Sequence, residues 1–148
     1  MEDYVRATLA LQAAGGCLPF VVRDAAGDIV GTTRYYELAP AVPRLLIGYT
    51  WYARRVQRTG LNTEAKLLLL AHAFETLGCV SVGLQTSHLN MASRTAIARI
   101  GATEEGVLRQ HMRHRDGSMR DTHCFSILDR EWPDCKARLQ AMLAEHTA

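Results

Sequence analysis

The sequence from residue 45 to residue 77 places an apolar run, a short polar loop and a helical segment in succession, and this order most constrains the fold. The run Leu45–Tyr52 is predicted to be a strand, and Leu61–Leu77 is predicted to be a helix. The first turn of a helix presents N–H groups without partners and the positive end of the helix dipole. We therefore expect an anion such as a phosphate group to bind where the loop meets the helix.

The loop itself carries positive charge and a glycine. Arg54, Arg55 and Arg58 lie on the approach to the helix, and Gly60 would let a phosphate come close to the backbone. The loop contains neither the Gly-x-x-x-x-Gly-Lys-[Ser/Thr] motif of P-loops nor the glycines of a dinucleotide fingerprint. Taken by itself, it could also be a helix-capping loop with surface arginines.

The composition favours one cytoplasmic domain and excludes several classes of protein. The chain has 148 residues, 48% hydrophobic and 22% charged, with a net charge of +2. This charge is too small to indicate binding to nucleic acid or to a membrane surface. No run approaches the roughly 18 apolar residues that span a bilayer, and Met1–Tyr4 does not resemble the start of a secretory signal.

The four cysteines show no pattern of a metal site or of a disulfide framework. Their spacing contains no C-x-x-C pair. We expect reduced and mostly buried thiols, at the following positions: Cys17, Cys79, Cys124 and Cys135. The histidines also give no metal site, because His111 and His114 would point to opposite faces of a strand and His123 would pair with Gln110. His72 is expected at an interface or in the core.

The segments before the loop predict a helix and a hairpin. Glu2–Ala14 has helical periodicity and ends at Gly15-Gly16. Two strands, Leu18–Arg23 and Ile29–Tyr36, follow with turn residues between them. The segment Glu37–Pro43, with two prolines, is predicted to be a loop.

The segments after the loop predict a parallel pair, a second helix and a second hairpin. The long helix should present one core face: Leu67, Leu70, Ala71, Phe74 and Leu77. A strand at Cys79–Thr86 then implies a parallel pairing with the run at Leu45–Tyr52. Asn90 would cap a helix that ends near Ile100. Strands at Glu105–Arg113 and Met119–Leu128 flank Asp116-Gly117, and a C-terminal helix opens near Pro133.

These elements give an α/β fold with a mixed, mostly antiparallel sheet flanked by helices, and several motifs resemble one family. Gln57-Arg58-Thr59-Gly60-Leu61-Asn62 is similar to the coenzyme A loop [Gln/Arg]-x-x-Gly-x-[Gly/Ala] of the GNAT N-acetyltransferases, and it departs at Asn62. The segments Asn90–Arg94, Ile100–Ala102 and Glu105–Arg109 resemble the RimJ/RimL-like (ribosomal-protein-alanine acetyltransferase-like) branch. The resemblance covers about residues 17 to 140.

The resemblance implies an acyltransferase that moves an acetyl group from acetyl-CoA directly to a primary amine, either a protein N-terminus or a small molecule. It implies no metal and no covalent enzyme intermediate. The coenzyme would contact strand residues, loop residues and the second helix, as follows: Thr50, Trp51, Tyr52, Gln57, Arg58, Thr59, Gly60, Leu61, Asn62, Thr63, Asn90 and Ser93. The central parallel strands would splay apart at this site.

The acid and the base are less well defined by sequence. In related enzymes a serine at the position of Ser93 lies near the thiol, which makes Ser93 a candidate acid. No carboxylate occurs in Leu45–Ile47, where the superfamily often has a glutamate. Asp121 is a weak base candidate, because a two-residue turn at Asp116-Gly117 would place it opposite Met112. An ion pair with Arg120 or Arg113 is the alternative role for Asp121.

The family normally begins with a further strand and helix, so the resemblance implies a single GNAT domain at residues 1–148 that lacks both. An uncovered sheet edge at Leu18–Arg23 would invite pairing, and we expect a possible homodimer through this edge. The alternative function is a degenerate GNAT module that binds acyl-CoA or a partner chain without turnover. Fold similarity does not identify the acceptor.

Overall fold

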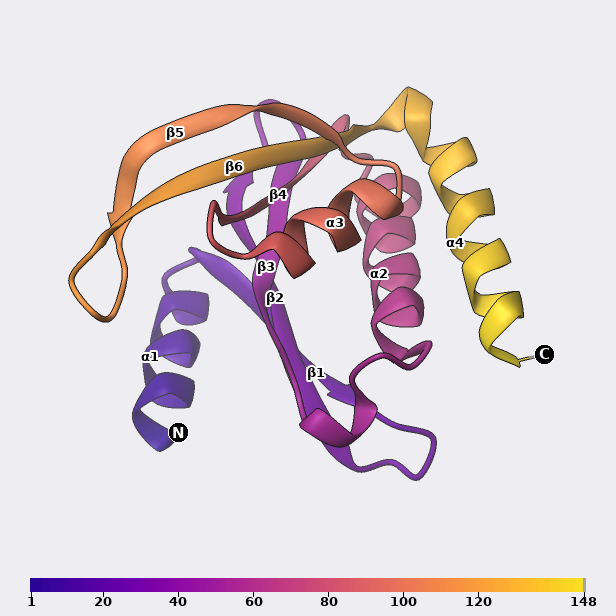
Figure 1. Ribbon diagram of the computed structural model, residues 1–148, viewed down its shortest axis with the longest axis horizontal. Coiled ribbons are helices and arrows are strands. Elements are labelled where there is room, and N and C mark those ends of the chain that lie inside the picture. The colour runs from indigo at the N-terminus through magenta and orange to yellow at the C-terminus, as the bar shows by residue number, and fades with distance from the viewer. Residues whose placement is uncertain (148) are drawn as a thin grey trace.

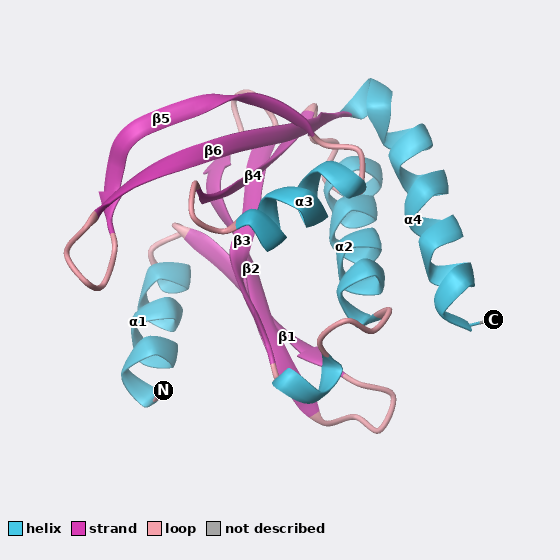
Figure 2. Cartoon of the chain, viewed as in Figure 1, coloured by secondary structure: helices cyan, strands magenta, loops and turns pink. Residues whose placement is uncertain are grey.

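The computed structural model describes residues 1–147 as a six-stranded sheet with helices on both faces (Figure 1 and Figure 2). The helices and strands are, in chain order, α1 Glu2–Ala13, β1 Cys17–Arg23, β2 Ile29–Ala39, β3 Arg44–Tyr52, α2 Leu61–Ala71, β4 Ser81–Ser87, α3 Met91–Arg99, β5 Thr103–Arg113, β6 Met119–Leu128 and α4 Trp132–Thr147. Short 3-10 turns lie at Arg54–Val56 and Asp129–Glu131.

The strand order is β1-β2-β3-β4-β6-β5, and β3 and β4 are the one parallel pair within the described sheet. Every other pair of neighbours is antiparallel. The mixed sheet and the central parallel pair predicted from the sequence are therefore confirmed. The parallel pair needs the crossover helix α2, because a tight turn cannot join two parallel strands.

Adjacent residues of β2 bind helices on opposite faces of the sheet. Arg34 points toward α1, where its Nη2 donates to the hydroxyl of Tyr4 at 2.7 Å. Tyr35 points the other way, and its hydroxyl donates to the backbone carbonyl of Leu69 in α2. Figure 1 shows α1 and α2 on the two sides of β1–β3, with α4 beside α2. The main core lies on the α2 side and includes Leu70, Ile127 and Leu139.

The predicted core face of the crossover helix is confirmed except at Leu77: Leu70 is buried, and Leu67, Ala71 and Phe74 are partly buried against the core. The residues that turn inward are Thr63, Lys66, Leu69, Leu70 and Ala73, whereas Leu77 is 47% exposed. The α-helix ends at Ala71 and continues as one π turn at His72–Thr76. A π turn has more residues per turn than an α-helix, so it rotates Leu77 out of the face that the α-helical spacing predicted.

A bulge in β2 and a longer β5–β6 turn correct the predicted strands. β2 continues to Ala39, because Glu37 adopts a φ of 48° and the register with β3 shifts between Tyr36 and Ala39. The β5–β6 turn runs from His114 to Ser118 and places Met112 opposite Arg120 rather than Asp121.

A further irregularity in β5 moves another pairing of the hairpin. Gln110 has a φ of 48°, and the register shifts between Leu108 and Met112. His123 therefore lies opposite Val107 and not opposite Gln110, as the two-residue turn had predicted.

The four thiols are free, as expected. Cys17, Cys79 and Cys135 are buried, and Cys124 is half-buried. Burial raises the pKa of the Cys135 thiol to about 11, which keeps it protonated and unreactive. No helix within residues 1–147 is long and apolar enough to cross a membrane.

Candidate functional site

The parallel strands β3 and β4 pair over three residues and then separate. The pairs are Arg44–Ser81, Leu45–Val82 and Leu46–Gly83. Beyond them lies a cleft of about 470 Å³, which we call the α2–α3 cleft. Its walls are the diverging strands, the first turns of α2, the inner face of α3 and Arg120 of β6. A cleft where parallel strands diverge is a common place for ligands in α/β folds.

Five of the residues predicted to contact the coenzyme converge in this cleft, namely Thr50, Tyr52, Asn62, Asn90 and Ser93. Trp51 does not line it, and its side chain is 56% exposed. The reason is strand alternation, since the side chains of Thr50 and Tyr52 point to one face of β3 and that of Trp51 points to the other. Asn90 caps α3 as predicted, because its Oδ1 accepts a hydrogen bond from the backbone N–H of Ser93 at 3.0 Å.

The remaining predicted residues form the loop between β3 and α2. The side chain of Gln57 donates to the backbone carbonyl of Tyr52 at 3.0 Å. Thr59 donates to the carbonyl of Val56 and accepts the backbone N–H of Leu61. Arg58 is exposed and has a φ of 61°. These contacts fix the loop shape, while Thr63 is buried inside the first turn of α2.

Gly60 has a packing role that the sequence did not indicate. Its φ of −67° suits any residue. A Cβ added at Gly60 would lie 3.3 Å from the Cβ of His146 and 3.5 Å from Leu143, both on α4. The glycine therefore lets the end of α4 pack against the start of α2.

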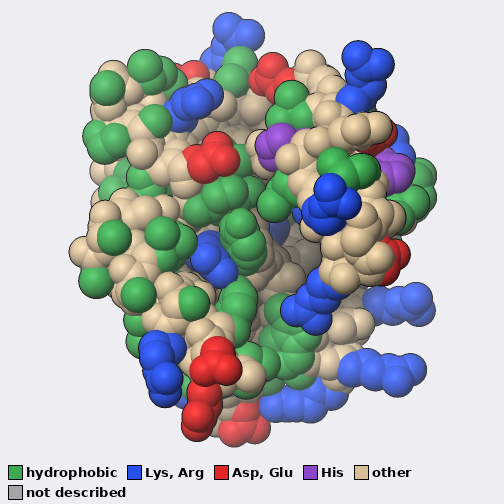
Figure 3. Space-filling view, turned by 90° about the vertical axis from the view of Figure 1, so that its left-hand side faces the viewer, with side chains coloured by type: hydrophobic (Ala, Val, Ile, Leu, Met, Phe, Trp, Pro, Cys, Tyr) green, Lys and Arg blue, Asp and Glu red, His purple; other side chains and the backbone are tan. Residues whose placement is uncertain are grey.

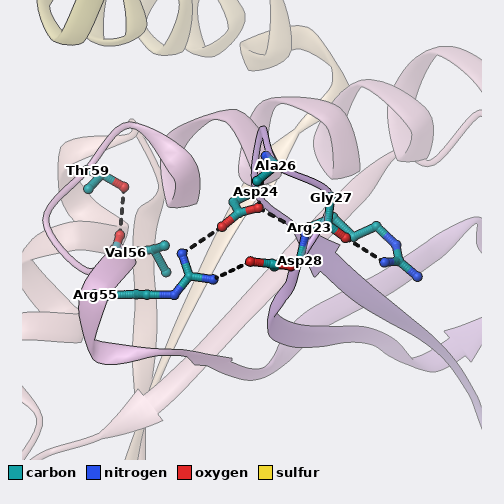
Figure 4. A network of polar contacts seen from close by, with 8 residues as sticks. All are labelled: Arg23, Asp24, Ala26, Gly27, Asp28, Arg55, Val56 and Thr59. Atoms are coloured by element: carbon teal, nitrogen blue, oxygen red, sulfur yellow. Dashed lines mark hydrogen bonds and ion pairs between the residues drawn. The ribbon is translucent and has the colours of Figure 1, made fainter.

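The three arginines of the loop are not equivalent, as Figure 4 shows for Arg55. Its guanidinium pairs with Asp24 at 2.7 Å and with Asp28 at 3.3 Å, both in the β1–β2 turn. The hydrogen bond from Arg55 holds the pKa of Asp24 below its ordinary value. Arg55 thus ties the loop to a hairpin, and its charge is largely balanced. Arg54 and Arg58 form no ion pair within residues 1–147, so no carboxylate of the described chain balances their charges.

Lys66 is a functional candidate that the sequence analysis missed. It is 8% exposed, it lines the α2–α3 cleft, and its Nζ lies 3.5 Å from the hydroxyl of Thr50. No carboxylate of the described chain pairs with it. Burial lowers its pKa to about 8. A buried lysine without a counter-ion is costly, so it stands out as a group that a ligand would satisfy.

Tyr52 is a second buried donor in the same cleft, and it has no hydrogen-bond partner within residues 1–147. Its hydroxyl is enclosed and, among the described residues, makes no hydrogen bond. Burial raises its pKa to about 12, so the hydroxyl stays protonated. Together, Tyr52 and Lys66 present two buried donors to the cleft; the hydroxyl of Tyr52 has no acceptor among the described residues, and Lys66 has one long hydrogen bond, to Thr50.

A bulge in β3 lies in the wall of this cleft. Tyr49 has a φ of 52°, and Tyr49 and Thr50 together oppose Thr33 where the register with β2 shifts. Such a bulge takes a residue out of the ladder of backbone hydrogen bonds. At Gly48, an added Cβ would lie 2.9 Å from Cε1 and 3.3 Å from the hydroxyl oxygen of Tyr36. The hydroxyl of Tyr36 therefore lies directly against the bulge.

A second hollow opens on the other side of this bulge, and we call it the α1-side hollow. Its volume is about 620 Å³. It shares Gly48, Tyr49, Gln85 and Arg120 with the α2–α3 cleft. Its other walls are Leu11, Gly16, Arg34, Tyr36, Glu37, His111 and Met112. Figure 3 shows the face with α1 and the β5–β6 hairpin, which is hollowed near its centre with lysine or arginine side chains around it.

Glu37 is the carboxylate of the α1-side hollow, and Asp121 lies outside both cavities. Oδ1 of Asp121 accepts the backbone N–H of Gln110 at 2.7 Å, and Asp121 lines a separate surface depression with Leu108. The ion pair with Arg120 or Arg113 that was the alternative is also not formed. Nothing in the sequence pointed to Glu37, since the bulge that turns it into the hollow lies in a segment predicted to be a loop.

The histidines do not form a metal site in the described chain. No group of three or more His, Cys, Asp or Glu side chains within residues 1–147 has metal-binding geometry. His88 and His114 nevertheless come together, with ring centroids 6.1 Å apart, because the turn at His114 curls toward β4. His72 is exposed and stacks on Tyr35, so it is not the core residue that was one of the two expected roles.

Comparisons with known proteins point to one family. Residues 1–103 match the acetyltransferase (GNAT) domain family. The N-acetyltransferase YoaA of Bacillus subtilis is 31% identical over 101 residues, which are 68% of this chain and 56% of the relative. The chain spans 56% and 57% of the lengths of the two curated relatives that it matches.

Two solved structures have a similar fold. A GCN5-related N-acetyltransferase from Brucella melitensis has a TM-score of 0.82 and 36% identity, over 86% of this chain and 58% of that one. RimJ of Mycobacterium smegmatis, solved in complex with CoA-disulfide, has a TM-score of 0.81 and 27% identity, over 95% of this chain and 67% of that one.

Proposed function

Because this chain belongs to the GNAT acetyltransferase family, we propose that it transfers an acetyl group from acetyl-CoA to a primary amine. The observation that carries this proposal is the meeting of two cavities at the β3 bulge. The α2–α3 cleft and the α1-side hollow share Gly48, Tyr49, Gln85 and Arg120. Two substrates that enter from opposite sides would meet there, as direct transfer requires.

The residues of the α2–α3 cleft fit the coenzyme. The hydroxyl of Tyr52 is a buried donor without an acceptor in the described chain, the Nζ of Lys66 has only a long hydrogen bond to Thr50, and the pantetheine arm offers amide carbonyl oxygens. The start of α2 presents backbone N–H groups to an anion, and Arg58 adds an unpaired charge. We propose that Asn62, Asn90 and Ser93 complete the coenzyme site, together with the loop residues that the sequence predicted.

Acetyl-CoA supplies a thioester whose carbonyl carbon can be attacked by an amine. On the protein side, the β3 bulge turns backbone toward the place where negative charge develops on the carbonyl oxygen, and we propose a backbone N–H of Tyr49 or Thr50 as the donor. Tyr36 is the proposed proton donor for the departing thiolate. Burial, with the negative charge of Glu37 nearby, raises the pKa of Tyr36 to about 12, so it is protonated at neutral pH.

Glu37 is the proposed base, acting directly or through one water on the incoming ammonium group. It lines the α1-side hollow, where the acceptor would bind. We prefer it to Asp121, whose carboxylate is bound to the backbone of Gln110. Ser93 stays a candidate acid because it lines the cleft, but Tyr36 lies closer to the bulge that both cavities share.

The finer assignment is to the RimJ/RimL-like branch, supported by the likeness to RimJ of Mycobacterium smegmatis. The acceptor would then be a protein N-terminus or a small amine, in a single-domain enzyme at residues 1–148. The free cysteines support the predicted cytoplasmic location. In the described sheet β1 is an edge strand, which supports the predicted homodimer, and light scattering at high concentration would contradict it by showing a monomer.

The first test is thermal unfolding with acetyl-CoA, with dephosphorylated pantetheine as the control. Ligand at 100 times its dissociation constant adds about 2.7 kcal/mol to the free energy of unfolding. A shift that needs the pyrophosphate, followed by release of free thiol in the presence of amines, supports the enzyme. A shift without release of the coenzyme A thiol in the presence of any tested amine supports the alternative, a GNAT module that binds acyl-CoA without turnover. No shift from a folded sample contradicts coenzyme binding, and the alternative module would then bind a partner chain instead.

A further inference from the structure

The α1-side hollow holds two arginines without counter-ions, and this inference rests on the proposed function of the site. Arg34 and Arg120 both line the hollow. Neither forms an ion pair with any carboxylate among residues 1–147. The hollow has one carboxylate, that of Glu37, so its charge is positive when His111 is neutral.

Arg34 is held in place with part of its hydrogen-bonding capacity unused. Its guanidinium lies 3.9 Å from the ring centroid of Tyr49 and 5.5 Å from that of Tyr4. Nη2 donates to Tyr4 and to the hydroxyl of Thr8. Its other N–H groups have no partner in the described protein. The residue is 7% exposed, so a rigid and weakly solvated cation faces the hollow. Such a guanidinium suits a planar anion.

Arg120 stands at the junction of the two cavities. Its Nε donates to the hydroxyl of Thr122 at 3.1 Å, and this contact fixes the side chain. Its remaining N–H groups have no partner among residues 1–147. An enclosed and unsatisfied nitrogen would be costly. The one fully enclosed unpaired side-chain N or O within the described residues is the hydroxyl of Tyr52, so the free N–H groups of both arginines reach solvent.

We propose that the acceptor is a primary amine that also carries an anionic group, a carboxylate or a phosphate. The anion would bind between Arg34 and Arg120, and this would place the amine beside Glu37 and the β3 bulge. The same positive field disfavours an ammonium group that lacks a neighbouring anion. Polyamines are therefore excluded as good acceptors, and the bound amine is more readily deprotonated for attack.

The test compares matched acceptors on the full chain with acetyl-CoA. Free amino acids are paired with their amides, and O-phosphoethanolamine is paired with ethanolamine, which separates carboxylate from phosphate. Spermidine is the cationic control. We expect kcat/KM to be at least tenfold higher for the anionic member of one pair, because its KM is lower. Equal values within a pair that is turned over, or a preference for the amide or for spermidine, would overturn the inference.

Variants separate this role from a structural one. Arg120→Gln should reduce the ratio of kcat/KM between the anionic and neutral acceptors to near one, whereas Arg115→Gln, on the exposed β5–β6 turn, should leave it unchanged. Arg34→Gln should lower stability because it removes the contacts to α1, so Arg34→Lys serves as the second variant at that position. An unchanged ratio in Arg120→Gln would mean that the arginines only hold the fold.

A binding measurement keeps the inference testable if no amine is turned over. The protein with bound coenzyme A is titrated with N-acetylated amino acids and with their amides. Tighter binding of the carboxylate, lost in Arg120→Gln, would support the anion site even though the proposed enzymatic function had failed. Equal binding of acid and amide would reject the anion site, whatever the result for turnover.

Discussion

The two cavities that meet at Gly48 are built differently, although they share a wall. Apart from Arg120 of β6, the α2–α3 cleft is lined by consecutive elements, β3, α2, β4 and α3, and it holds two buried donors, the hydroxyl of Tyr52, which is unpaired in the described chain, and the Nζ of Lys66. The α1-side hollow is assembled from residues far apart in the chain, from Leu11 to Arg120, and holds charges of both signs. A continuous segment thus forms the side proposed for the coenzyme, and distant segments form the side proposed for the acceptor.

The difference teaches which part of such a fold can vary. A site made from one strand–loop–helix–strand unit keeps its geometry through local backbone contacts, such as Gln57 to Tyr52 and Asn90 to Ser93. A site made from α1, β2, β3 and the β5–β6 hairpin depends on bulges and packing, so a few substitutions change its charge. Acceptor choice is therefore expected to reside in the α1-side hollow.

The sharpest way to break this comparison is to remove the hydroxyl that lies at the junction. Tyr36→Phe should lower kcat about 100-fold, because general acid catalysis typically contributes that much or more. The affinity for coenzyme A, measured by titration calorimetry, should not change, because Tyr36 lines the α1-side hollow and does not line the α2–α3 cleft. Tyr49→Phe is the control that keeps an aromatic ring at the bulge. A kcat within twofold of the parent would contradict the assignment of Tyr36.

Gly48→Ala tests whether the junction tolerates a side chain. The new Cβ would lie 2.9 Å from the ring of Tyr36, so the ring must move. Displacing a catalytic group by about 1 Å can cost up to about 100-fold in rate, and we expect a fall somewhat smaller than that of Tyr36→Phe. Gly83→Ala is the matched control, because its Cβ meets the flexible side chain of Leu46. Equal rates for both variants would show that the junction is not tight.

Lys66→Met sharpens the contrast on the coenzyme side. Loss of a charged donor should weaken coenzyme A binding about tenfold, with little change in the preference among acceptors. The free energy of unfolding of Lys66→Met should instead increase. Burial holds the pKa of Lys66 near 8, below the ordinary 10.5, so the folded state disfavours the charged form at pH 7. The variant should gain up to about 3 kcal/mol there.

The pH dependence gives the sign of this effect. Between pH 8 and pH 10.5 the unfolded chain keeps the Lys66 proton and the folded chain releases it, so the contribution of Lys66 to stability rises with pH. Below pH 8 both states are protonated and the penalty is complete. Urea unfolding at pH 7 and pH 9.5 should show that the difference in free energy of unfolding between parent and variant is smaller at pH 9.5. The thiols titrate in both proteins, so their contribution cancels in this difference. A difference in free energy of unfolding that stays constant with pH would contradict the lowered pKa of Lys66.

Arg55→Gln is expected to have the smallest effect. It removes the link from the coenzyme loop to Asp24 and Asp28, which is exposed and therefore weak. A looser loop should raise the dissociation constant for coenzyme A roughly two- to threefold, measured by calorimetry at low salt. Arg54→Gln is the control with equal loss of charge and no ion pair. If Arg54→Gln has the larger effect, charge on the approach matters more than loop order.

Sequence patterns predicted the elements that depend on local chemistry. Asn90 was placed as a cap because a short polar side chain can bind the first-turn N–H groups, and it does so. The Gly15-Gly16 stop of α1, the crossover helix and the parallel pair were also predicted, since they follow from periodicity and chain connectivity. The loop from Gln57 to Thr63 was located for the same reason.

Other features needed the tertiary structure because they depend on backbone irregularities that no local pattern encodes. The bulges at Glu37, Tyr49 and Gln110 set which side chains enter the α1-side hollow, and the longer turn from His114 to Ser118 moved Asp121 away from Met112. The π turn after Ala71 turned Leu77 outward.

The sequence by itself determined the order of elements and the strand–loop–helix unit, and it predicted an anion site at the start of α2. Only the tertiary structure decided that Lys66 is buried without a counter-ion, that Tyr36 lies against Gly48, and that Arg34 and Arg120 share one hollow. The physical reason is range. Helix caps and periodicity act over a few residues, whereas desolvation and charge balance depend on every segment that the fold brings within a few ångströms.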